Sequence, residues 1–169
     1  SLPSRGLGDV YKRQGDETSQ NKTYTYKELK SEISKFANVL KKLGVKKGDV
    51  VTIYLTMIPE VAFAMLACAR IGAIHSVIFG GFAPESIAGR IKDCKSQFVI
   101  TADEGIRGGK IIPLKKYINT ALEDCDDSIK TLVVRYTNTQ DDLHKVNNFY
   151  YDELIKEVDD QCCLLYTSD

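Results

Sequence analysis

Short apolar runs rich in β-branched residues alternate along this chain with segments of helical periodicity, and this alternation limits the possible folds most narrowly. The apolar runs occupy residues 50–55, 74–79, 98–101 and 131–134, and the helical segments 26–43, 59–70, 113–122, 149–158 and a stretch that begins at Pro84. Continuous apolar strands are typical of parallel sheets that are covered on both faces. The sequence therefore predicts an α/β fold, part of a doubly wound parallel sheet with helices on both faces.

Several helix ends carry their own signals. Thr25 and Glu28 have the spacing of a capping box, and Gly44 supplies a stop for the first helix. Pro59 opens the second helix, at a position where its missing N–H costs nothing. We expect a loop over residues 103–110, between the strand at 98–101 and the helix at 113–122.

Charge and cysteine content exclude several classes of protein. The chain of 169 residues has 23 basic and 23 acidic side chains, so it lacks the positive excess of a nucleic-acid binder. Its five cysteines are too sparse for a disulfide scaffold, which favours a reducing compartment such as the cytoplasm. The most apolar interior run, 61–69, is too short to cross a membrane. An organellar targeting segment upstream remains open.

The two ends of the chain are related to one another at the level of DNA. Codons for residues 9–14 can be chosen so that their reverse complement, read one base out of frame, encodes the Cys-Leu-Leu-Tyr-Thr-Ser of residues 163–168. We therefore expect residues 1–14 and 163–169 to be translated sequencing adapter and residues 15–162 to be the authentic segment. The alternative is that both ends are native and the match is accidental.

Two glycine-containing loops follow predicted strands and are candidate anion sites. In the first, Gly80 and Gly81 come between Phe79 and a helix, where backbone N–H groups and the helix dipole favour a negative charge. In the second, Arg107 and Lys110 bracket two glycines and can converge on a phosphate. A plain tight turn and a solvated loop are the respective alternatives. Neither segment has the spacing of a dinucleotide fingerprint or a P-loop.

Other polar residues give weaker signals. We expect His75 to be a packed structural histidine and His144 to be exposed in a polar loop. Asp103 and Glu104 are carboxylates beside a candidate site, but their pairing gives no assignable acid–base role. Cys68 and the other interior cysteines lie too far apart for a zinc motif, so no metal site is predicted.

Several interior motifs occur in the order found in one known family. The interior resembles the N-terminal region of the AMP-forming acetyl-CoA synthetases, which are adenylate-forming acyl-CoA ligases. The resemblance extends over nearly all of residues 15–122, fades in 125–162, and is carried by residues 36–38, 43–50, 57–60, 64–73, 75–82, 89–91, 99–101 and 107–110.

The resemblance implies a ligase that joins acetate to ATP and then transfers the acetyl group to coenzyme A. It implies that Phe79, Gly80 and Gly81 lie against the CoA nucleotide, and that Arg107 and Lys110 bind its phosphates. Other members can have Arg where this chain has Lys110. The ATP and Mg²⁺ contacts, the acetate pocket and the catalytic lysine are expected downstream, so no catalytic residue is assigned and the chain alone is expected to be inactive.

Two alternatives remain open at this level. Propionyl-CoA synthetases share much of the pattern, and discrimination of one methylene depends on an acyl pocket outside these residues. A non-catalytic nucleotide-binding α/β module would show the same alternation of strands and helices.

Overall fold

The computed structural model describes residues 11–12, 22–139 and 147–165 of the chain, with side chains described from residue 22 onward. A parallel sheet of five strands, in the order β4-β3-β5-β8-β9, forms its centre. Two antiparallel pairs, β1 with β2 and β6 with β7, lie outside this sheet. The elements are β1 (Tyr11–Lys12), β2 (Thr23–Tyr24), α1 (Tyr26–Leu43), β3 (Val50–Leu55), α2 (Pro59–Ile71), β4 (Ile74–Phe79), α3 (Pro84–Asp93), β5 (Phe98–Ala102), β6 (Gly105–Arg107), β7 (Lys110–Ile112), α4 (Leu114–Glu123), β8 (Lys130–Val134), β9 (Asn148–Tyr150), α5 (Tyr151–Leu154) and a 3₁₀ turn (Ile155–Glu157).

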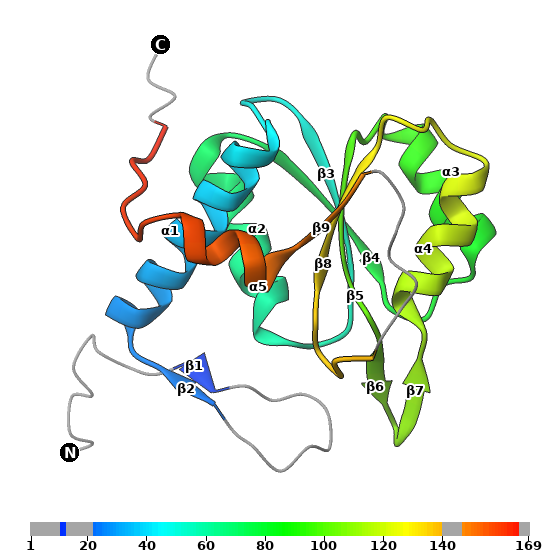
Figure 1. Cartoon of the computed structure of the whole chain (residues 1–169), viewed down its shortest axis with the longest axis horizontal. Helices are drawn as coiled ribbons and strands as arrows, with labels where there is room; N and C mark the ends of the chain where they lie inside the picture. The colour runs from blue at the N-terminus through cyan, green and yellow to red at the C-terminus, as the bar shows by residue number, and fades with distance from the viewer. Residues whose placement is uncertain (1–10, 13–21, 140–146, 166–169) are drawn as a thin grey trace, which may run out of the picture.

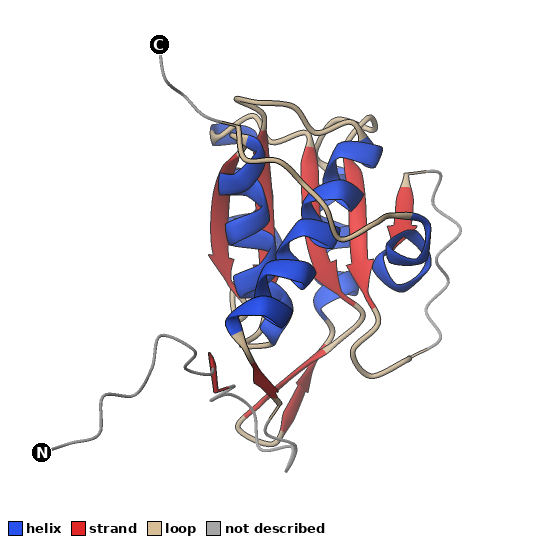
Figure 2. Ribbon diagram, turned by 90° about the vertical axis from the view of Figure 1, so that its left-hand side faces the viewer, coloured by secondary structure: helices blue, strands red, loops and turns tan. Residues whose placement is uncertain are grey.

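Helices cover both faces of the central sheet, which confirms the predicted architecture. Figure 1 shows α1, α2 and α5 on one side of the strands and α3 and α4 on the other. Figure 2, turned by 90°, shows the strands running side by side behind the helices of one layer. Strands β3, β5 and β8 supply fully buried side chains to the core, among them Ile53, Ile100 and Leu132.

The predicted helix signals act as expected. Thr25 accepts from the backbone N–H of Glu28, and the Glu28 carboxylate accepts from the backbone N–H of Thr25 at 2.7 Å, completing the capping box. Gly44 ends α1 with a φ of 98°, a left-handed conformation that glycine adopts without strain.

The structure corrects three local expectations. His75 is exposed and not packed, because it lies on β4, the edge strand of the sheet. Ile74 and Val77 of the same strand are also exposed, so the helices do not fully cover β4. The tail expected to be helical over 149–158 begins as a strand, β9, and only then forms α5 and the 3₁₀ turn. The expected loop between β5 and α4 contains the hairpin β6–β7.

Only parts of the two suspected adapter segments are described, namely residues 11–12 and 163–165. At the second of these, the backbone N–H of Leu165 donates to the carbonyl of Arg70 at 3.1 Å. The assignment of both segments stays a prediction. Residue His144 lies outside the described residues. No described helix is both long and apolar enough to cross a membrane.

Candidate functional site

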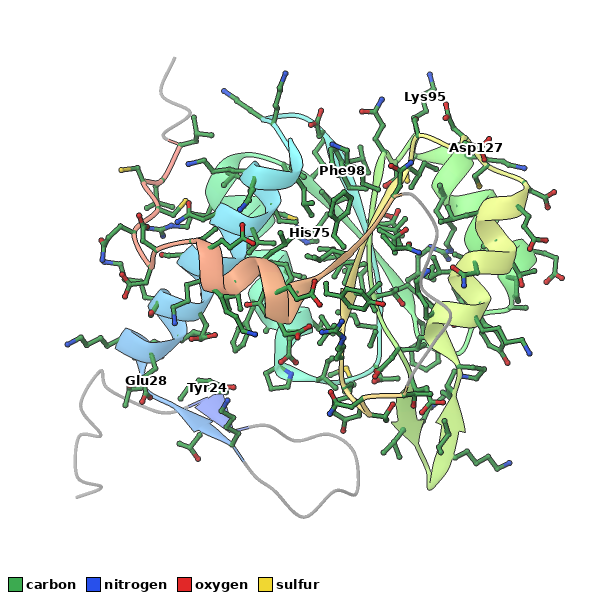
Figure 3. All side chains as sticks on the ribbon, viewed as in Figure 1. Tyr24, Glu28, His75, Lys95, Phe98 and Asp127 are labelled. Carbon is green, nitrogen blue, oxygen red and sulfur yellow. The ribbon has the colours of Figure 1, made fainter. Side chains whose placement is uncertain are left out.

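The carboxyl ends of the parallel strands meet at one edge of the sheet. The residues that follow β3, β4, β5 and β8 are Thr56, Gly80, Asp103 and Arg135. In Figure 3, Lys95 and Phe98 mark the opposite edge, at the start of β5, and the hairpin β6–β7 projects from the edge where the strands end. Open α/β sheets bind ligands at this carboxyl edge.

The loop after β4 is fixed by its own hydrogen bonds. The N–H groups of Gly81 and Phe82 both donate to the carbonyl of Phe79, at 2.8 and 3.1 Å. From the neighbouring strand, the Tyr54 hydroxyl donates to the carbonyl of Phe82 at 3.1 Å, and burial raises the pKa of Tyr54 to about 12, so the donor stays protonated. The Gly81 N–H is thus engaged within the loop, and the expectation that backbone N–H groups here approach an anion stays a prediction.

The second predicted loop is a tight hairpin. Gly108 and Gly109 have φ angles of 55° and 71°, and two consecutive left-handed residues are the signature of a type I′ turn. Arg107 and Lys110 flank this turn as cross-strand partners, and both are exposed. The turn thus holds two cations side by side at the tip of the hairpin.

The two predicted loops meet through Arg107 and Phe79. The Arg107 guanidinium lies over the Phe79 ring, with 4.5 Å between its Cζ atom and the ring centroid. Gly81 makes this possible, because a Cβ atom at that position would lie 3.0 Å from Arg107 Nη1 and 3.1 Å from the Phe79 ring. The Phe79 side chain remains 53% exposed, so a ligand can reach it. Gly80 packs against Thr56, and Lys110 stands on the adjacent hairpin strand.

A small cavity of about 100 Å³ lies between these loops, and side chains from three elements and the connections after them enclose it. Its lining residues are Leu55, Thr56, Met57, Phe79, Gly80, Ile106 and Arg107. Sequence reasoning missed the contributions of Thr56, Met57 and Ile106. The first two directly follow a buried parallel strand, and the rule for the carboxyl edge would have pointed to them.

Asp103 is a structural carboxylate. It is 4% exposed, and its two oxygens accept from the backbone N–H groups of Glu104, Tyr136, Thr137 and Thr139 at distances between 2.8 and 3.3 Å. It therefore ties the connection after β8 to the connection after β5 and is fully occupied with that task.

Glu104 acts in the same way as its neighbour. Its carboxylate accepts from the hydroxyl groups of Thr137 and Thr139 at 2.9 and 2.8 Å. Within the described parts of the chain, no three His, Cys, Asp or Glu side chains form a group that could hold a metal ion.

The fold and the cavity at its carboxyl edge define a parallel α/β protein with an aromatic and a cationic side chain beside that cavity. The chain belongs to the AMP-binding enzyme family, whose model matches residues 10–168.

Relatives with closely similar sequences are acetyl-coenzyme A synthetases. The chain is 52% identical to that of Xanthobacter autotrophicus over 162 residues and 55% identical to that of Yersinia pestis over 163 residues, in both cases 95% of this chain and 25% of the relative. It is 54% identical to that of Parvibaculum lavamentivorans over 88% of this chain and 23% of the relative. The chain therefore spans about a quarter of the length of these curated relatives.

A solved structure supports the same fold. The chain resembles an acetoacetyl-CoA synthetase from Streptomyces lividans with a TM-score of 0.75, over 86% of this chain and 22% of that one. At 21% sequence identity, this likeness establishes the fold alone.

Proposed function

We propose that this chain is part of an acetate–CoA ligase and carries a portion of its coenzyme A site. The observation that carries the proposal is the contact between Arg107 and Phe79, which joins two segments far apart in sequence into one surface. An aromatic ring offers a stacking face to a nucleobase, and adjacent cations suit phosphate groups. Similarity to acetyl-CoA synthetases at 52–55% identity favours acetate as the acyl substrate.

In the proposed reaction, acetate attacks the α-phosphate of ATP to give acetyl-adenylate and pyrophosphate, and the CoA thiol then displaces AMP. The described residues take part only in the second step. Phe79, with Gly80 and Gly81 in the same loop, supports the adenine base of CoA, while Arg107 and Lys110 bind its phosphates. We assign ATP, its Mg²⁺ and acetate to the part of the relatives' length that lies outside this chain, and the working compartment to the cytoplasm.

Replacement of Arg107 tests this assignment. The variant Arg107→Ala should weaken CoA binding to the purified chain about tenfold, since a charged hydrogen bond to phosphate is lost. Titration followed by two-dimensional NMR measures the affinity. Lys41→Ala is the matched control, because it removes an exposed positive charge at the end of α1.

An equal loss of affinity in the Arg107 and Lys41 variants would refute a specific site. In the full-length enzyme, Arg107→Ala should raise the KM for CoA and leave formation of acetyl-adenylate nearly unchanged. An equal loss in both half-reactions would contradict the assignment of Arg107 to CoA.

A further inference from the structure

Thr56 is a buried polar residue in the lining of the candidate site, and its hydroxyl group makes no hydrogen bond within the described parts of the chain. The residue is 7% exposed, and Oγ1 finds no hydrogen-bond partner among the residues that the structure describes. A hydroxyl buried without a partner destabilises the folded state, because its bonds to water are lost and not replaced. Such a group in a folded protein calls for an explanation.

Two glycines leave the space that the Thr56 side chain occupies. A Cβ atom at Gly105 would lie 2.3 Å from Thr56 Cγ2 and 2.8 Å from Oγ1, and one at Gly80 would lie 3.2 Å from Cγ2. Gly105 begins β6 and Gly80 follows β4, so both elements of the candidate site leave room for this one side chain. The Thr56 side chain thus lies between the hairpin and the loop after β4, with its hydroxyl toward Gly105.

The same side chain lines the cavity that Phe79 and Arg107 enclose. Aromatic rings and guanidinium planes stack on the faces of nucleobases, whereas hydroxyl groups recognise the polar atoms at base edges. A base that stacks against Phe79 would present its edge to this cavity, whose lining includes Thr56. The hydroxyl suits either kind of edge atom, since it can donate to a ring nitrogen or accept from an amino group.

We propose that the Thr56 hydroxyl hydrogen-bonds to the edge of the adenine base of bound CoA and is a specificity-determining residue of this site. The inference rests on the proposed function, because it takes CoA as the ligand. The bond satisfies a group that is unsatisfied in the free chain, so ligand binding removes a cost that folding leaves in place.

The test uses the complete 169-residue chain and two ligands, CoA and adenosine 3′,5′-bisphosphate. Both contain the adenine base, but only CoA carries the pantetheine arm. Thr56→Val keeps the branched shape and removes the hydroxyl, so it should weaken binding of both ligands about fivefold, as expected for one neutral hydrogen bond. Thr56→Ala should show at least the same loss, and Thr56→Ser, which keeps the hydroxyl, should retain most of the affinity.

Stability in the absence of ligand supplies a second readout. Thr56→Val should unfold at the same temperature as the wild type or higher, because an unsatisfied buried hydroxyl is removed. A clear loss of stability with unchanged affinity would identify Thr56 as a structural residue and overturn the proposal. A loss of affinity for CoA but not for adenosine 3′,5′-bisphosphate would overturn the assignment to the base.

Failure of the proposed function gives a different pattern. If the wild-type chain binds neither ligand, or if Arg107→Ala changes nothing, both the CoA site and the role of Thr56 are refuted. If Arg107→Ala weakens binding and Thr56→Val does not, the CoA site stands and only the present inference fails.

Discussion

At the scale of single residues, small side chains decide where the large ones can lie. Gly81 leaves the space that the Arg107 guanidinium fills above the Phe79 ring, and Gly105 leaves the space for Thr56. These roles are steric and leave little trace in a sequence, because a glycine that makes room looks the same as one that makes a turn. The sequence pointed to Gly81 on the expectation that its N–H would approach a ligand, whereas in the structure this N–H donates to the carbonyl of Phe79.

Cysteine reactivity gives a prediction at this scale. Cys68 is fully buried in α2, and burial raises the pKa of its thiol to about 12, so only about one molecule in ten thousand carries the thiolate at pH 8. Cys163 is exposed. Iodoacetamide at pH 8 should therefore modify Cys163 rapidly and leave Cys68 unmodified, as read by peptide mass spectrometry.

Denaturant provides the control for this experiment. In concentrated urea both cysteines should react, because unfolding exposes the Cys68 thiol and returns its pKa to the ordinary range. Modification of Cys68 in the native chain at a rate similar to that of Cys163 would show that α2 opens readily, contrary to its packing here.

At the scale of elements, the long apolar runs were predictable and the short polar elements were not. The strands at 50–55 and 74–79 match β3 and β4, because both are runs of β-prone residues, almost fully buried in β3 and largely exposed at the sheet edge in β4. β9 has only three residues and forms because β8 offers it an open edge, which is information outside its own sequence. The hairpin β6–β7 was recognisable from two glycines between β-prone residues, but the flanking charges favoured a loop.

The turn of this hairpin yields a prediction about the site. A Cβ atom at Gly108 would meet nothing within 4 Å, so any effect of substitution comes from its φ of 55°. Gly108→Val should lower the free energy of unfolding by about 1–2 kcal/mol, since β-branched residues are strained in the left-handed region. The same change should weaken CoA binding, because Arg107 and Lys110 flank the turn.

Gly108→Asn is the matched variant, because asparagine tolerates the first central position of a type I′ turn. It should preserve both stability in urea and CoA affinity. If the valine and asparagine variants behave alike, the turn does not position the two cations.

At the scale of the whole molecule, the chain holds one part of a larger family fold. It spans about a quarter of the length of its curated relatives. We therefore expect the purified chain to bind CoA weakly and to release no pyrophosphate when acetate and ATP are supplied. A coupled pyrophosphate assay measures this, with the acetyl-coenzyme A synthetase of Yersinia pestis as the positive control. Acetate-dependent pyrophosphate release by the chain itself would contradict the expectation.

The order of the strands also bears on how the sheet is assembled. β4 pairs on one side of β3, and every later strand joins the open side of the strand before it in the sheet, β5 on β3, β8 on β5 and β9 on β8. No strand has to be inserted between two that are already paired. A chain that emerges from the ribosome with its N-terminus first can therefore extend the sheet outward in the order of synthesis, and each partly made sheet exposes the edge that its next strand will occupy.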